Sequence, residues 1–260
     1  MKEEEKVAKQ LEIINSGKYP EIIRLIEKED LCKEAQLALL KRNKPVEIIM
    51  YIKNHTFCEE AGLELIKKGK TEAVVLYISE HFLSDNEELA LIKRGITEEI
   101  QYYIIGSCFC EKSQEALIKR GDKDEIMLYI SRLHLYESVQ IVLVKKGTPD
   151  EIGFYASQHG FCSEAQIALI NLGDSDKIKA HIAEDSLSNE AQLALIKRGN
   201  TEEIKAYISK HNLCKEAQIA LIKRNQTDEI VFYSTTRCFN EEVQGILIST
   251  LTKKGTDKKS

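Results

Sequence analysis

A repeat of constant length runs along almost the whole chain. The segments 187–212 and 213–234 have nearly the same sequence, LSNEAQLALIKRGNTEEIKAYISKHN and LCKEAQIALIKRNQTDEIVFYS, and further copies occur along the chain without insertion or deletion. The copies begin every 26 residues, at Leu31, Phe57, Leu83, Phe109, Leu135, Phe161, Leu187, Leu213 and Phe239, with a degenerate copy from near Glu5. A fixed period of this size predicts stacked supersecondary units rather than one compact globule. Positions within a repeat are numbered from 1, so that Leu187 is position 1.

Each repeat divides into two helical halves. The first half is built from Glu, Ala, Gln, Leu and Lys, which favour helix, with acidic residues at its start and Lys or Arg at its end. The second half opens on Thr, Ser, Asp or Pro followed by acidic residues, which is an N-cap signature. Glycine or asparagine at position 13 predicts a left-handed helix end. These residues are Asn43, Gly69, Gly95, Gly121, Gly147, Gly173, Gly199 and Asn225.

Helices of about ten residues are not stable alone, so neighbouring repeats must bury one another's apolar faces. We therefore predict an all-α fold, a right-handed α-solenoid of about ten helix-turn-helix repeats. We expect residues 1–252 to form a single repeat domain and residues 253–260 to form a basic flexible tail. The chain resembles the HEAT-like two-helix solenoids, and its 26-residue period is close to that of the leucine-rich-repeat-variant type. That resemblance implies a scaffold or binding surface.

Composition narrows the class of protein. Hydrophobic residues make up 43% of the chain, charged residues 30%, and the formal net charge is −5, which does not favour general binding to polyanions. No apolar run approaches the length of a membrane span, and the N-terminal stretch lacks the apolar core of a signal peptide. The seven cysteines then suggest reduced thiols, so we expect a cytoplasmic protein. The polar terminal repeats favour a monomer.

Variable apolar residues on the second helix are the main candidates for binding. Positions 18, 21 and 22 form its core face, whereas positions 19 and 20 lie further round the helix and are often apolar. Packing between repeats and a groove for a protein or peptide both account for this pattern. The candidate residues are Met50, Leu76, Tyr102, Leu128, Phe154 and Phe232 at position 20, and Val75 and Met127 at position 19.

A second candidate surface is the basic pair at positions 11 and 12. Stacked repeats would align these cations into a ridge that can follow the phosphates of a nucleic acid. Helix-end charge complementarity, offset by acidic residues at positions 16 and 17, explains the same pattern without a ligand. The candidate phosphate-binding residues are Arg42, Lys68, Arg94, Arg120, Lys146, Arg198 and Arg224.

Glutamine recurs at position 6, inside the apolar arc of the first helix. A buried amide needs hydrogen-bond partners, and we expect these side chains to bond across repeats, with reading of a ligand as the alternative. They are Gln10, Gln36, Gln114, Gln140, Gln166, Gln192, Gln218 and Gln244, with Gly62 and Glu88 as exceptions.

No arrangement of reactive residues predicts catalysis. Five cysteines share position 2 and lack the spacing of a zinc site. Four histidines (His55, His81, His159 and His211) share position 25, where a ring can satisfy helix-end carbonyls. His181 stands where other repeats have tyrosine, and we expect a partly buried, hydrogen-bonded side chain. We expect no enzyme activity, no cofactor and no metal, because no nucleophile, base and orienting group come together.

Overall fold

The computed structural model describes residues 3–257, and these residues form 19 α-helices and no strand. They divide into two compact units, Met1–Tyr129 and Ile130–Ser260, each of which is described by itself. The first unit contains α1 (Glu3–Ser16), α2 (Tyr19–Lys28), α3 (Lys33–Arg42), α4 (Pro45–Asn54), α5 (Glu59–Lys68), α6 (Thr71–Glu80), α7 (Asp85–Arg94), α8 (Thr97–Gly106) and α9 (Glu111–Arg120), and α10 (Lys123–Ile130) reaches its end. The second contains α11 (Glu137–Lys146), α12 (Pro149–Gln158), α13 (Ser163–Leu172), α14 (Ser175–Glu184), α15 (Asn189–Arg198), α16 (Thr201–Lys210), α17 (Lys215–Arg224), α18 (Thr227–Thr236) and α19 (Glu241–Asp257).

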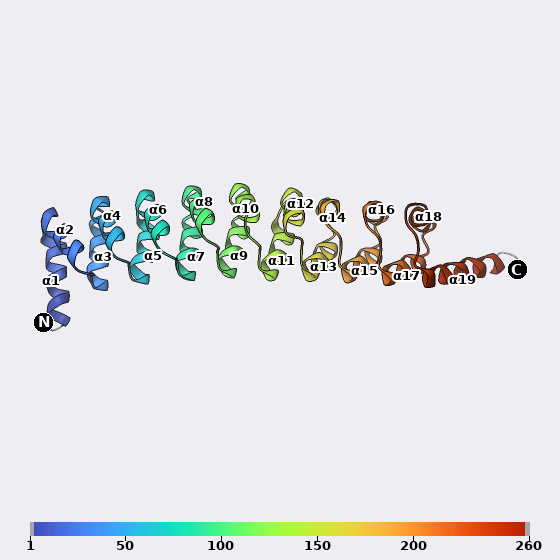
Figure 1. Ribbon diagram of the computed structural model, residues 1–260, viewed down its shortest axis with the longest axis horizontal. Helices are drawn as coiled ribbons and strands as arrows, with labels where there is room; N and C mark the ends of the chain where they lie inside the picture. The colour runs from blue at the N-terminus through green and yellow to red at the C-terminus, as the bar shows by residue number, and fades with distance from the viewer. Residues whose placement is uncertain (1–2, 258–260) are drawn as a thin grey trace. The chain divides into compact units, whose positions relative to one another are not determined.

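Each unit is a two-layered stack of helical pairs. Odd-numbered helices pack on the next odd-numbered helix and even-numbered helices on the next even-numbered one, as α3, α5 and α7 and α4, α6 and α8 show (Figure 1). From α3 to α18 the first helix of a repeat always starts at position 3, and the second always starts at position 15. The predicted all-α solenoid architecture is confirmed.

The flexible tail expected over residues 253–260 stays a prediction. Helix α19 continues to Asp257, five residues beyond the predicted domain end at 252, and residues 258–260 lie outside the described residues. Whether residues 1–252 act as a single domain stays a prediction.

The core is formed by two residue pairs on each first helix and one face of each second helix. On α15, positions 5, 6, 9 and 10 are buried, whereas positions 7 and 8 are half-exposed. A helix turns about 100° per residue, so residues at i, i+1, i+4 and i+5 share one face and the two residues between them point away. The expected core positions 18, 21 and 22 are buried on α16, as Ile204, Tyr207 and Ile208.

Most helix ends have the predicted left-handed residue. Four glycines at position 13 and both asparagines have positive φ, but Gly69 and Gly147 are extended, with φ of −67° and −66°. Each of the two glycines still donates its N–H to the carbonyl of position 9, so both conformations close the helix, and glycine adopts either without steric cost. The second helices begin one residue earlier than expected: the Thr, Ser, Asp or Pro of position 15 is the first helical residue, and position 14 is the N-cap, as Asp174 and Asn200 show by accepting backbone N–H bonds.

The glutamines of position 6 join successive repeats, as predicted. Gln192 donates its Nε2 to the Leu187 carbonyl (2.9 Å) and accepts the Cys214 N–H of the next repeat at its Oε1 (2.6 Å). Gln36, Gln140, Gln166 and Gln218 make the same pair of bonds. Because both ends of a buried amide are satisfied, the ladder fixes the register of one repeat on the next.

The two exceptions to this ladder are compensated. Glu88 accepts the Cys110 N–H and the Tyr103 hydroxyl, both at 2.9 Å, so a carboxylate replaces the amide. At Gly62 the vacant space is filled by Glu87 of the next repeat, whose Oε1 accepts the Tyr77 hydroxyl at 2.9 Å.

Candidate partner-binding surface

The eight predicted partner-binding residues lie on the outer side of the second helices. Tyr102 is exposed (45%), and the other seven are half-buried, so none of them belongs to the fully buried core. Partial burial means that each side chain packs against neighbours by one edge and presents the other to solvent. The structure is therefore compatible with both interpretations of these positions.

The eight residues do not form one continuous patch. Met50, Val75, Leu76 and Tyr102 lie on α4, α6 and α8, which pack consecutively in the first unit, and Met127 and Leu128 lie on α10. In the second unit, α14 and α16 lie between Phe154 on α12 and Phe232 on α18. Those intervening helices carry lysine at position 19 and alanine at position 20. In the first unit, every second helix from α4 to α10 thus carries an apolar residue at position 19 or 20, whereas in the second unit α14 and α16 have only lysine and alanine there.

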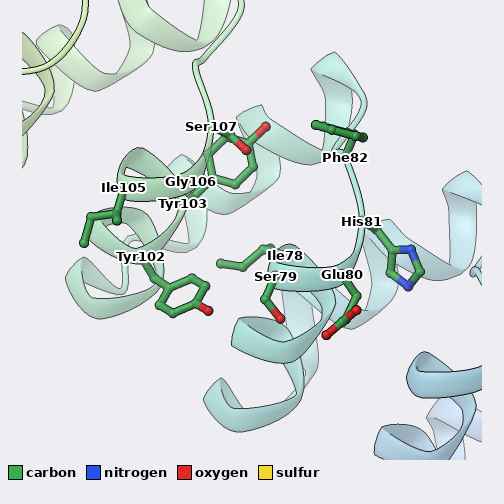
Figure 2. A pocket seen from close by; sticks show the side chains of 10 residues that line it. All are labelled: Ile78, Ser79, Glu80, His81, Phe82, Tyr102, Tyr103, Ile105, Gly106 and Ser107. Carbon is green, nitrogen blue, oxygen red and sulfur yellow. The ribbon is translucent and has the colours of Figure 1, made fainter.

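A pocket opens between the ends of α6 and α8, within the first unit. It encloses about 360 Å³ and is lined by Ile78, Ser79, Glu80, His81 and Phe82 from the end of α6 and by Tyr102, Tyr103, Ile105, Gly106 and Ser107 from α8. Figure 2 shows Tyr102 extending from α8 toward Ser79 and Glu80, with Phe82 on the connection that follows α6. Among the predicted partner-binding residues, Tyr102 lines this pocket.

Two residues missed by sequence reasoning give this pocket its character. Phe82 is 95% exposed and Ile105 is 57% exposed. The other repeats place polar or small residues where Phe82 stands (position 26), and mostly Ser, Lys or Thr where Ile105 stands (position 23). The signal was therefore present as a break in the repeat: a large apolar residue at a position that is elsewhere hydrophilic.

The arginines of the predicted phosphate ridge are paired with groups of the solenoid itself, although Arg120 and Arg198 remain exposed. Arg198 pairs through Nε with Glu203 (3.1 Å), whose side chain is fully buried, and donates Nη2 to the Gly173 carbonyl of the preceding repeat (2.8 Å). Arg42, Arg94, Arg120 and Arg224 pair in the same way with Glu47, Glu99, Glu125 and Glu229, and also bond carbonyls of the preceding first helix or its cap. Burial raises the pKa of Glu99 despite its arginine. Each of these arginines thus caps the first helix of the preceding repeat.

The repeats with Lys68 and Leu172 at position 12 also lack glutamate at position 17, whereas the repeat with Lys146 keeps Glu151. Position 12 is Lys68 in the repeat where position 17 is Ala73, and Lys68 pairs instead with Glu64 on its own helix (2.7 Å). In the repeat with Leu172, position 17 is Lys177, which is buried and donates Nζ to the Val144 carbonyl (3.0 Å). Lys146 is exposed. The five-residue spacing between Arg and Glu was the signal that a surface-ridge interpretation overlooked.

Three of the four histidines of position 25 cap a helix, and this helix belongs to the preceding repeat; the buried Nε2 of the fourth, His81, has no hydrogen-bond partner among the described residues. His55, His159 and His211 each place Nε2 within 2.6–3.1 Å of the carbonyl at position 22 of that repeat, and Arg237 substitutes for histidine in the last such contact. The ring therefore ties neighbouring second helices together.

His181 differs from the expected hydrogen-bonded side chain. It is fully buried on α14, and neither ring nitrogen has a hydrogen-bond partner among the described residues. Burial lowers the pKa of His181 to about 4, while Asp185 opposes the shift and His211 adds to it. A neutral, buried imidazole of this kind has no access to a substrate.

The seven cysteines are free thiols, and only Cys108 and Cys238 are exposed. Over the described part of the chain, no three His, Cys, Asp or Glu side chains converge as metal ligands would. In the same residues, no helix is both long and apolar enough to cross a bilayer.

Comparison of the chain with models of protein families, with curated proteins and with solved structures finds no match.

Proposed function

We propose that this solenoid binds a protein or peptide partner along the second helices of its first unit, centred on the pocket between α6 and α8. The observation that carries the proposal is the exposure of Phe82, Tyr102 and Ile105 around one opening. Large apolar side chains gathered at the surface are typical of contact sites. The pocket would receive an apolar side chain of the partner.

The flanking surface supports the same proposal. Met50, Val75 and Leu76 extend the half-exposed apolar area from the pocket across α6 and α4. The remainder of each repeat is explained by capping, the glutamine ladder and buried ion pairs. The residues that depart from the repeat are therefore the candidates for function, and their apolar character supports binding without catalysis.

We do not extend the proposal to nucleic acid. Five arginines and Lys68 of the ridge are engaged in ion pairs with carboxylates of their own repeats. The free thiols, two of them exposed, suit the reducing cytoplasm that we propose as the location.

A photo-crosslinking residue in place of Tyr102, compared with one in place of Ala206 on α16, tests the surface. The captured partner is then purified and its Kd measured against the wild-type chain and the triple variant Phe82→Ser, Tyr102→Ala, Ile105→Ser. Truncating a central aromatic costs about 2 kcal/mol, so affinity should fall by about 30-fold or more.

The matched control is Val231→Ser with Phe232→Ala, which removes the exposed side chain of Val231 and the half-buried one of Phe232 from α18 in the second unit. This control should bind as wild type. Equal affinity of the triple variant and wild type, with both folded by circular dichroism, would rule the pocket out. Sedimentation of the same variants distinguishes a heterologous partner from self-association.

A further inference from the structure

Two histidines from successive repeats meet at one point in the second unit. His134 lies on the connection before α11, and His159 is the C-cap of α12. Nδ1 of His159 is 3.2 Å from Nε2 of His134, and the ring centroids are 4.1 Å apart. In repeat terms these are positions 26 and 25 of consecutive repeats. For the other histidines of position 25, position 26 of the preceding repeat is Asp30, Thr56 or Ser186, so this combination of two histidines occurs once in the sequence.

The tautomer of His159 is set by its other nitrogen. Nε2 of His159 lies 2.6 Å from the Ile130 carbonyl oxygen. A carbonyl accepts only, so Nε2 carries the proton, and the neutral ring has its lone pair on Nδ1, the nitrogen that faces His134. A ligating histidine in a metal site is typically held in this way, with its second nitrogen donating to a backbone carbonyl.

The spacing of the two nitrogens suits a shared metal ion. With metal–nitrogen distances of about 2.05 Å, a nitrogen separation of 3.2 Å subtends about 103° at the metal, close to the tetrahedral angle. His134 is exposed, so an ion and its water ligands have access. Without metal, one proton between the nitrogens fills the same gap.

We propose that His134 and His159 form a binding site for a divalent transition-metal ion of the Zn²⁺, Ni²⁺ or Cu²⁺ class. Imidazole nitrogen selects these ions over Mg²⁺ and Ca²⁺, which prefer oxygen. Since no third protein ligand converges on the pair among the described residues, water completes the coordination. The bound ion ties the connection before α11 to the end of α12 and stabilises that part of the stack by mass action.

Titration of the full chain with ZnCl₂ by calorimetry tests this proposal. Exposed thiols also bind zinc, so the background is Cys108→Ser with Cys238→Ser. One equivalent should bind, and His134→Asn should weaken binding by about tenfold or more. His134→Asn is the informative variant because it leaves the bond from His159 to Ile130 in place.

The matched control is His211→Gln. His211 occupies the same position as His159 and contacts the Ile182 carbonyl at 3.1 Å, but has no second histidine beside it. Zinc binding should be unchanged in this variant. Zinc affinity that His134→Asn does not alter, or the absence of a saturable equivalent in the background chain, would overturn the proposal.

Discussion

Replacing the buried His181 by tyrosine, the usual residue at this position of the repeat, should make the free energy of unfolding less sensitive to acid. Burial holds the pKa of His181 at about 4, against 6.5 for an ordinary histidine. Below pH 6.5 His181 is protonated in the unfolded chain, whereas in the folded chain it stays neutral until about pH 4. The free energy of unfolding therefore falls as the pH falls from 6.5 to 4.

The size of the effect follows from the same two values. A difference of about 2.5 pKa units corresponds to about 3 kcal/mol when the pH is well below 4, and about 2 kcal/mol of this is lost between pH 7 and pH 5. Tyrosine should also add a hydrogen bond at pH 7. Tyr155 and Tyr207 accept the Leu135 and Leu187 N–H groups at 3.2 and 3.3 Å, and a tyrosine at 181 would do the same for Phe161. One such bond contributes about 1 kcal/mol.

Urea denaturation followed by circular dichroism at pH 7 and pH 5 provides the measurement. Carboxylates titrate in both proteins, so the difference between His181→Tyr and wild type isolates His181. The reciprocal variant Tyr207→His, at the same position of the next repeat, should introduce a similar loss. The reasoning is refuted if wild type and His181→Tyr lose equal stability between the two pH values.

Three further predictions concern packing, charge and the metal site. Gly62→Ala should lower the free energy of unfolding by about 2 kcal/mol, because the added β-carbon would lie 2.0 Å from the Glu87 carboxylate that fills the space. Gly153→Ala, whose added β-carbon would have its nearest neighbour at 3.5 Å, should raise the free energy of unfolding by about 1 kcal/mol. Urea denaturation measures both variants, and equal effects would contradict the packing argument. Arg198→Ala should cost about 3 kcal/mol in the same assay, because it leaves the fully buried carboxylate of Glu203 without its cation; a cost under about 1 kcal/mol would mean that the pair is only superficial. Ser186→His should create a second zinc equivalent in calorimetry by placing a histidine at position 26 before one at position 25, and an unchanged stoichiometry would show that the spacing alone is insufficient.

The candidate surface was only partly predictable from sequence. Tyr102 was identified because position 20 is variable and apolar, but Phe82 and Ile105 stand at positions that the helical wheel assigns to the end of the second helix and its connection. Their exposure depends on how the ends of α6 and α8 approach each other, and a wheel drawn for one helix contains no such information.

The phosphate ridge illustrates the same limit for charge. A row of Lys-Arg pairs at helix ends predicts an exposed cationic surface when each helix is considered alone. In the folded stack the arginine reaches the glutamate five residues later and a carbonyl of the previous repeat, which are partners from two different elements. Which groups a long side chain contacts depends on how the neighbouring backbones pack, so the contacts cannot be assigned from one helix alone.

The sequence by itself determined the helices, the boundaries of α3 to α18 within one or two residues, the constant 26-residue step and the glutamine ladder, because these depend on local propensity, capping and a pattern that recurs from copy to copy. Only the tertiary structure decided which sides of the helices remain in contact with water, which arginines are committed to capping, and that His134 meets His159. Those features arise between repeats, from the distance and orientation of neighbouring helices, and a linear repeat carries them only as small departures from its own consensus.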